Sequence, residues 1–309
     1  MSEGFIRVRA FYHEDYYFPL PANHPFQMGK FPGGREIVAK EGSDISICEA
    51  PEALESELLL VHSPSYLKRV RSGDWKPAEV VRMGLPLDHR LFRRCSLEVG
   101  GSILAGKSAL KTGLAANLGG GTHHADKERA SGYCIFNDVA VAIRAIRREH
   151  PDLWVMVIDT DAHQGDGTHS LFAGDRRVFT YSIHVGKNFP AKKVPGDCDV
   201  PLPRGVDGRS YENAFFSSVE RAFLEFEPDL VFWVAGADIH ERDRFGQMSL
   251  TESDIRQRNR FVIDLVRGWN VPLAIVYGGG YNRDPRLTDW LHALPVLQAG
   301  NGNVGFYSK

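Results

Sequence analysis

The sequence has few cysteines and no surplus of charge. Its 309 residues include four cysteines, which lie far apart and form no C-x-x-C pair: Cys48, Cys95, Cys134 and Cys198. This spacing indicates neither a disulfide framework nor a cysteine zinc site, so we expect buried free thiols in a reducing compartment. The 37 lysines and arginines nearly balance the 39 aspartates and glutamates, which gives a net charge of −2. We therefore expect no direct binding of nucleic acid, because that needs a basic face.

Long apolar runs are also absent. No run reaches the roughly 18 residues of a membrane span, and Met1–Arg9 has no signal-peptide core. We expect a soluble, cytoplasmic protein with no membrane partner. The composition of 43% hydrophobic and 25% charged residues is typical of a globular chain. Because the sequence shows no internal repeat and no linker, we predict one domain over residues 1–309.

The common signatures of nucleotide binding and of serine hydrolases are missing. The triple glycines at 119–121 and 278–280 do not fit G-x-G-x-x-G, and neither G-x-x-x-x-G-K-[ST] nor G-x-S-x-G occurs. Two arginine clusters, at 144–148 and 256–260, have the spacing of a solvated helix face. The unusual feature of the composition is 31 glycines beside 12 histidines.

The sequence does contain a regular alternation of strands and helices. Short apolar runs rich in β-formers predict strands at 5–12, 45–48, 115–118, 154–158, 178–184, 230–234 and 272–277. Apolar spacing and capping residues predict helices from 64, over 91–111, 137–150, 211–226 and 251–269, and from 285. A further helix after Pro25 is interrupted or delayed by Pro32–Gly34, and residues 58–61 form a buried run. This order predicts an α/β fold, with a mostly parallel central sheet covered by helices on both faces.

Chemically active residues collect where the predicted strands end. In parallel sheets, binding sites form beyond the carboxyl ends of the strands. Four glycine-containing segments there carry acids, histidines or a tyrosine, at residues 119–124, 159–167, 236–238 and 278–281. These segments are the candidate site.

Three residues of the second segment suit a metal ion. Asp159, Asp161 and His163 alternate, so their side chains share one face if the strand continues. Two carboxylates and an imidazole side by side need a cation, and they are normal ligands of zinc and iron(II). A solvated acidic turn is the other interpretation. Asp238, after the strand at 230–234, would be a further acidic ligand, although an aspartate there also suits a helix cap.

The histidine pair and the tyrosine suit proton transfer. His123 and His124 are adjacent, which does not match the i, i+4 ligand pair of helical zinc motifs. Beside an activated water, one imidazole can take a proton while the other keeps a fixed protonation state. Tyr281 can place a phenol beside a polarised carbonyl. Histidine pairs and turn tyrosines also occur without chemical roles.

Taken together, the sequence resembles the histone deacetylase superfamily, the arginase-deacetylase fold group, and its class IV and bacterial-type branches most. The matching blocks run in family order from about residue 5 to about residue 299. They are LVHSPSYL at 60–67, GGGTHHA at 119–125, GYCIFNDVAVA at 132–142, DTDAHQGDGT at 159–168, GAD at 236–238 and GGGY at 278–281.

The resemblance implies a role for each matching residue. Asp161, His163 and Asp238 hold one metal ion, zinc or alternatively iron(II). His123 and His124 act on the attacking water, with Asp159 and Asp166 as their carboxylate partners, and Tyr281 polarises the amide carbonyl. Tyr133 and Phe189 line the channel for an acyl-lysine side chain. A structural potassium site is implied at five residues: Asp159, Asp161, His163, Ser182 and Ile183.

Some positions depart from the family pattern. Tyr133 stands where relatives most often have Phe, and Gln164 replaces a second histidine, which favours the class IV side. The polyamine deacetylases of the superfamily carry an acidic gatekeeper seven residues after the last metal aspartate, where this chain has Phe245. An apolar residue there favours acyl-lysine over a cationic polyamine. Rim loops at 12–31 and 73–90 match nothing that names a substrate.

The implied activity is metal-dependent hydrolysis of an acetyl or short acyl group from lysine in proteins or peptides. Deacetylation of a small N-acyl amine such as an acetylpolyamine is the alternative within the enzyme class. A catalytically silent acyl-lysine binder is an alternative from another class. An arginase-like binuclear enzyme would need more aspartate and histidine ligands than these blocks provide.

Overall fold

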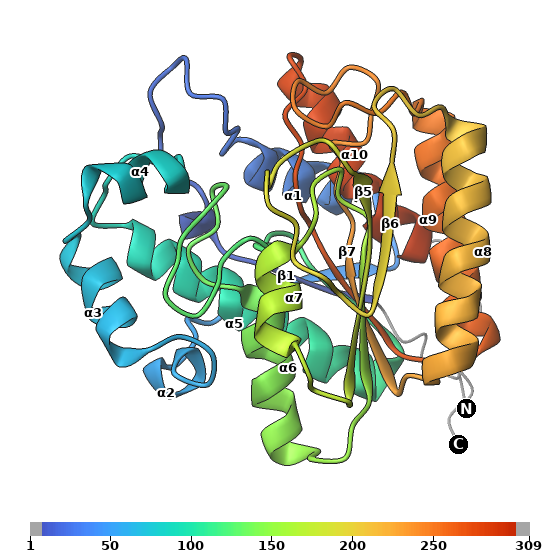
Figure 1. Ribbon diagram of the computed structural model, residues 1–309, viewed down its shortest axis with the longest axis horizontal. Helices are drawn as coiled ribbons and strands as arrows, with labels where there is room; N and C mark the ends of the chain where they lie inside the picture. Colours follow the sequence, from blue (N-terminus) through green and yellow to red (C-terminus); the bar gives the residue numbers. More distant parts are fainter. Residues whose placement is uncertain (1–7, 301–309) are drawn as a thin grey trace.

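An eight-stranded sheet forms the centre of the computed structural model, which describes residues 8–300 (Figure 1). Its strand order is β2-β1-β3-β8-β7-β4-β5-β6, and every neighbouring pair is parallel. The predicted mostly parallel sheet is thus confirmed as all-parallel within these residues. The strands are β1 (Val8–Tyr12), β2 (Ile45–Glu49), β3 (Leu114–Asn117), β4 (Val155–Asp159), β5 (Val178–Val185), β6 (Cys198–Leu202), β7 (Leu230–Val234) and β8 (Leu273–Val276).

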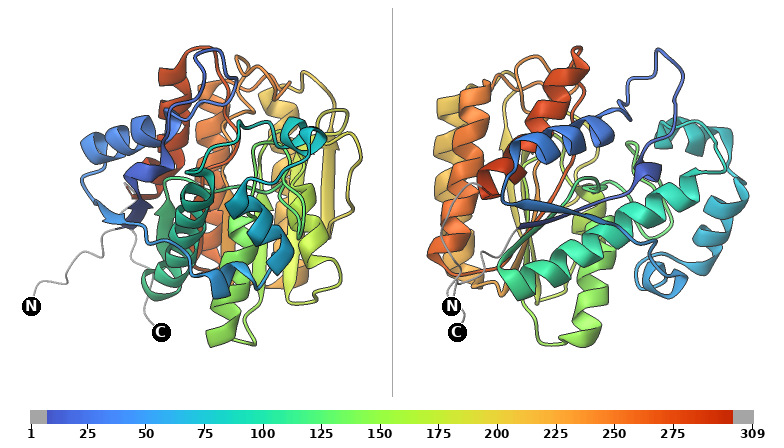
Figure 2. Two further views of the ribbon diagram at one scale, coloured as in Figure 1. Left: turned by 90° about the vertical axis from the view of Figure 1, so that its left-hand side faces the viewer. Right: turned by 180° about the vertical axis from the view of Figure 1, so that it is seen from behind.

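Helices cover both faces of the sheet, as predicted. On one side stand α5, α6 and α7, and on the other α8 and α9, with α10 and α1 extending that second layer (Figures 1 and 2). The shorter α2, α3 and α4 lie beyond α5. The bounds are α1 (Lys30–Glu41), α2 (Glu55–Leu58), α3 (Pro64–Ser72), α4 (Pro77–Met83), α5 (Leu91–Thr112), α6 (Asp138–Glu149), α7 (Asp166–Phe172), α8 (Gly208–Phe226), α9 (Glu252–Gly268) and α10 (Pro285–Gly300).

The predicted elements agree with the structure apart from a few local differences. Helix α1 runs through Pro32–Gly34 without interruption, because Pro32 lies in its first turn, where the missing N–H has no acceptor within the helix. The run 58–61 ends α2 and enters a turn, and Leu59 within it is 40% exposed. Strand β6 was not predicted, because its five residues, CDVPL, include an aspartate and a proline, which are rare in strands. As an edge strand of the described sheet, paired with β5, it tolerates Pro201.

Side-chain caps fix several helix starts. Ser63, Asn137 and Asp207 each accept a hydrogen bond from the backbone N–H three residues later. Thr251 and Asp254 form a reciprocal capping box at the start of α9. These caps satisfy backbone donors that would otherwise lack partners, so the helices begin at defined residues.

The prediction of two solvated arginine clusters is wrong at Arg258. This side chain is fully buried, and it donates to Gly236 O at 2.7 Å and to Thr160 Oγ1 at 3.2 Å. A helix-face spacing does not reveal which residue of the cluster turns inward to meet buried carbonyls. In the other cluster, Arg144 and Arg147 share the carboxylate of Asp175.

The expectation of buried free thiols is confirmed for two of the four cysteines. All four cysteines are free; Cys95 and Cys134 are buried, whereas Cys48 and Cys198 are partly exposed. Within residues 8–300, no helix has the length and apolar character needed to cross a membrane. The strand predicted from residue 5 extends outside the described residues, and the domain limits at 1 and 309 stay a prediction.

Candidate active site

The four candidate segments meet because their strands are neighbours. Strands β3, β8, β7 and β4 lie side by side in the middle of the sheet and run parallel, so their carboxyl ends share one edge. Each strand leads directly into one glycine-containing segment. The site is therefore assembled from four separate chain segments that lie between residues 119 and 281.

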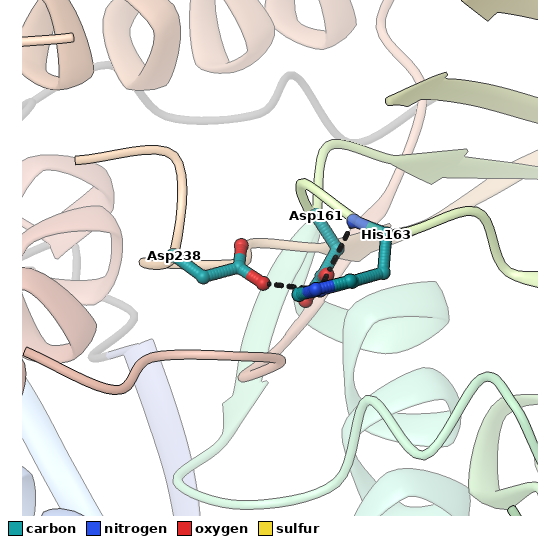
Figure 3. A group of neighbouring side chains, drawn as sticks. All are labelled: Asp161, His163 and Asp238. Carbon is teal, nitrogen blue, oxygen red and sulfur yellow. Dashed lines mark hydrogen bonds and ion pairs between the residues drawn. The ribbon is translucent and has the colours of Figure 1, made fainter. Parts of the chain in front are cut away.

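Asp161, His163 and Asp238 form a compact buried group (Figure 3). Asp161 and His163 come from the loop after β4, and Asp238 from the loop after β7. His163 Nδ1 lies 2.8 Å from Asp238 Oδ2 and 3.0 Å from Asp161 Oδ1. One potential ligand atom from each residue lies within 4.8 Å of the other two. The two carboxylates are fully buried.

The electrostatics of this group suit a cation. Burial and the neighbouring Asp161 charge raise the pKa of Asp238 to about 7. Burial lowers the pKa of His163, but hydrogen bonds to the two carboxylates outweigh it and raise the pKa to about 10. Both raised pKa values mean that the group attracts positive charge. Two carboxylates and an imidazole therefore fit a divalent metal ion.

His123 and His124 are each held by a carboxylate. His123 Nδ1 lies 2.6 Å from Asp159 Oδ2, and His124 Nδ1 lies 2.7 Å from Asp166 Oδ1. The two Nε2 atoms are 3.1 Å apart. Carboxylate contacts of this kind fix the tautomer, with the proton on Nδ1. Each ring therefore turns Nε2 inward.

The two histidines differ in proton affinity. For His123, burial lowers the pKa, but the charges of Asp159 and Asp161 outweigh it and raise the pKa to about 9. For His124, burial and the charge of His123 lower the pKa to about 4, against the opposing effect of Asp166. The arrangement places a protonated imidazole beside a neutral one.

Tyr281 faces the same group from the fourth segment. Its ring centroid is 6.4 Å from that of His163, and the residue is only 7% exposed. Burial and the charges of Asp161 and Asp238 raise the pKa of the phenol well above its usual range. The phenol thus stays protonated and can act as a hydrogen-bond donor.

The glycines beside Tyr281 leave room for these contacts. A Cβ on Gly279 would collide with the carboxylate of Asp238 and would lie 2.8 Å from Asp161 Oδ2. The segment after β8 therefore packs directly on two candidate metal ligands. Gly279 N also donates to Asp161 Oδ2 at 2.6 Å.

A cavity of about 270 Å³ leads to the site. The predicted channel residues Tyr133, Phe189 and Phe245 all line it, and the Phe189 ring lies 4.8 Å from His124. The rim segment 73–90, which was predicted as a loop, contains helix α4, and it contributes Val81, Arg82 and Gly84. The cavity walls are mostly apolar, and no carboxylate lines them in the described part of the chain.

The predicted potassium residues lie on two adjacent strands and the following loop. Asp159 on β4 is paired in register with Ser182 on β5, next to Ile183. Asp161 and His163 follow in the loop after β4. All five residues are buried. Gln164, which replaces a histidine of the family pattern, does not join Asp161, His163 and Asp238. Its Nε2 donates instead to Val194 O and Asp199 Oδ1.

Several supporting residues were not identified from the sequence. Asp138 accepts hydrogen bonds from Gly121 N, Thr122 N and Thr122 Oγ1, and so fixes the turn before the histidine pair. Lys30 is buried and donates to Gly278 O at 2.7 Å. Asp138 lies in the matching block at 132–142, but nothing in its local sequence shows which segment it contacts.

Comparison with known proteins agrees with this geometry. The model of the histone deacetylase domain matches residues 24–297. Histone deacetylase 2 of Arabidopsis thaliana is 31% identical over 84% of this chain and 70% of that protein. The acetoin utilization protein AcuC of Staphylococcus aureus strain MRSA252 is also 31% identical, over 84% of this chain and 73% of its own length. An uncharacterized protein of Picosynechococcus is 37% identical over 92% of this chain and 95% of that protein.

Among solved structures, the HDA15 HD domain matches the fold. Its TM-score is 0.78 at 22% identity, covering 95% of this chain and 93% of that chain. The single α/β domain with a parallel sheet is thus the arginase-deacetylase fold. The chain belongs to the histone deacetylase family, whose members are hydrolases that remove acetyl groups.

Proposed function

We propose that this chain is a metal-dependent lysine deacylase. It hydrolyses the N-ε-acetyl or short acyl amide of lysine in proteins or peptides, giving free lysine and a carboxylate. The observation that carries the proposal is the buried group of Asp161, His163 and Asp238 at the inner end of a channel. Family membership supports the deacetylase chemistry.

Asp161, His163 and Asp238 are the proposed ligands of one zinc or iron(II) ion. Such an ion supplies Lewis-acid chemistry, because it polarises the acyl carbonyl and lowers the pKa of water. Three protein ligands leave positions open for other groups, as in catalytic zinc sites. A structural potassium ion is proposed at Asp159, Asp161, His163, Ser182 and Ile183.

The histidine pair handles the protons. His124 is neutral, and Asp166 holds its Nδ1, so its Nε2 carries the lone pair that takes the proton of the attacking water. His123, protonated and held by Asp159, stabilises negative charge that develops beside it. The protonated base then returns a proton to the leaving lysine amine.

Tyr281 stabilises the tetrahedral oxyanion by donating a hydrogen bond from its phenol. The support for this role is the buried, protonated phenol beside His163. A donor that is already in place costs no reorganisation during reaction, and losing one such donor typically lowers kcat by about 10²- to 10³-fold.

The channel favours an acyl-lysine side chain. Tyr133 and Phe189 offer apolar walls for the lysine methylenes, and Phe245 presents an apolar surface where a polyamine enzyme needs a carboxylate. Because no carboxylate lines the cavity within residues 8–300, a cationic polyamine would be desolvated there without compensation.

The test is hydrolysis of a fluorogenic acyl-lysine panel by purified protein with measured zinc or iron(II) occupancy. We expect turnover of acetyl or short acyl lysine, with higher kcat/KM than for acetylspermidine. Preference for acetylspermidine would favour the small-amine alternative. Binding of acyl-peptide without any turnover would favour the silent binder.

A further inference from the structure

The backbone of Tyr281 is held on both sides by two consecutive residues. The Asp243 carboxylate accepts a hydrogen bond from Tyr281 N at 2.6 Å. Arg244 Nε donates to Tyr281 O at 2.8 Å. Both residues belong to the loop after β7, which also carries Asp238 and Phe245. The loop thus binds both the backbone N–H and the backbone carbonyl of Tyr281, whose phenol faces Asp161, His163 and Asp238.

The other end of the Arg244 side chain reaches the rim. Its Nη2 donates to Pro25 O at 2.7 Å, across 219 positions of sequence. The next residue, Phe26, packs on the channel, with its ring centroid 5.0 Å from that of Tyr133 and 6.3 Å from that of Tyr281. One guanidinium therefore joins the rim loop to the Tyr281 segment.

The segment before Tyr281 depends on such contacts for its position. Gly278–Gly280 have no side chains that restrict their backbone conformation, so hydrogen bonds contribute to placing it. Three contacts anchor the first two glycines: Lys30 to Gly278 O, Gly279 N to Asp161, and Ala237 N to Gly279 O. After Gly280, the contacts of Asp243 and Arg244 hold Tyr281.

A guanidinium suits this task. Its planar fork presents several N–H donors in fixed directions, so it can bind two carbonyls of different segments at once. Asp243 is already engaged by three backbone N–H groups, of Phe245, Gly246 and Tyr281. Arg244 lies at the surface, so changing it leaves no buried charge unpaired.

We propose that Arg244 is a positioning residue for Tyr281. By binding Tyr281 O and Pro25 O, it sets where the phenol lies and couples that position to the rim loop. The residue touches neither substrate nor metal in this account. The inference rests on the proposed function, because it requires the Tyr281 hydroxyl to act in turnover.

The first test compares Arg244→Ala with a matched variant, Arg242→Ala. Arg242 is a neighbouring surface arginine, and its ion pair with Glu241 is 4.0 Å long. Since a displacement of about 1 Å at a reacting group can cost about 10²-fold, we expect R244A to lower kcat by roughly 10- to 100-fold. We expect R242A to stay within about twofold of wild type. The variant R244K, which can bind one carbonyl, should be intermediate.

The second test asks whether Arg244 acts through the phenol. In a double-mutant cycle with Tyr281→Phe, R244A should cause little further loss of kcat once the hydroxyl is gone. Metal content and the thermal midpoint are measured for every variant. A full additional loss in the Y281F background would overturn the inference, as would wild-type kcat for R244A.

The outcomes separate the two levels of the account. Wild-type turnover by Y281F would contradict the oxyanion role in the proposed function, and the inference would fall with it. An impaired Y281F together with a fully active R244A would contradict only the inference. If R244A does not fold, the same double-mutant cycle is run with R244K. A kcat of R244K equal to that of wild type would then overturn the inference.

Discussion

His123 and His124 face each other with their Nε2 atoms 3.1 Å apart. Each Nδ1 is held by a carboxylate, so each Nδ1 carries a proton. Two bare Nε2 lone pairs at this distance would repel, and an additional proton on one ring relieves the repulsion. The raised pKa of His123 and the lowered pKa of His124 place that proton on His123. The pair therefore combines a fixed cation with a neutral base.

The proposed role of His124 as the base depends on Asp166. Replacing Asp166 by Asn removes the charge that holds Nδ1 and the tautomer. Loss of such a supporting contact typically costs about 10- to 100-fold, and we expect that loss in kcat with little change in KM. Steady-state kinetics check this, with metal content as the control. An unchanged kcat in a metal-loaded D166N protein would contradict the assignment.

If Asp161, His163 and Asp238 bind a metal ion, Asp238→Asn should have opposite effects on thermal stability with and without metal. In the metal-free protein, two buried carboxylates oppose each other, so D238N should be more stable than wild type. With zinc present, wild type should be the more stable, because it binds the ion more tightly. Thermal denaturation of both proteins, with chelator and with zinc, measures the two differences. The same order in both conditions would contradict the proposed ligand set.

Asp289 should make stability depend on pH. Burial raises its pKa to about 6, with Glu36 and Asp284 adding to the shift, so the folded state favours the protonated acid. Its ionisation then destabilises the fold as pH rises from about 4 through 6. Allowing for its partial exposure, we expect Asp289→Asn to stabilise the protein by roughly 1 kcal/mol at pH 8 and by less at pH 5. Urea denaturation measures this.

The control for that experiment is Asp207→Asn. Asp207 is exposed, and its hydrogen bond from the backbone N–H of Ser210 lowers its pKa. Removing it should give no gain at pH 8. A pH-independent effect of D289N would show that its titration is not the cause.

Phe245 is predicted to discriminate between substrate classes. Phe245→Glu places a carboxylate in the cavity, which should lower kcat/KM for an acetyl-lysine peptide and raise it for acetylspermidine. Gln247→Glu is the matched control, since Gln247 also lines the cavity but is exposed. The ratio of the two kcat/KM values measures the change. An equal shift in both variants would indicate general charge attraction instead of a role for position 245.

The sequence could predict the site segments but not their spatial order. The strands before 119–124, 159–167, 236–238 and 278–281 are recognisable because their apolar runs are short and are followed by segments that contain glycine. Their adjacency in the sheet depends on long-range pairing, which local patterns do not encode. The resemblance to a known family, and not the local sequence, indicated which residues of the four segments act together.

Residues that act through buried hydrogen bonds were beyond reach. Arg258 has the same helical spacing as its solvated neighbours, yet it turns inward to Gly236 O. Arg244 lies beside Arg242 in the chain, but only Arg244 meets two carbonyls, of Pro25 and Tyr281. Such contacts depend on the tertiary position of acceptors far away in sequence.

The most direct test of the central claim is turnover of an acetyl-lysine peptide by three preparations: zinc- or iron(II)-loaded protein, chelator-treated protein and metal-loaded Y281F. We expect the metal-loaded protein to hydrolyse the peptide. Chelation should abolish this turnover, and added metal should restore it. We expect Y281F to have a kcat about 10²- to 10³-fold lower. Turnover that survives removal of the metal, or an inactive loaded protein across the acyl-lysine panel, would contradict it.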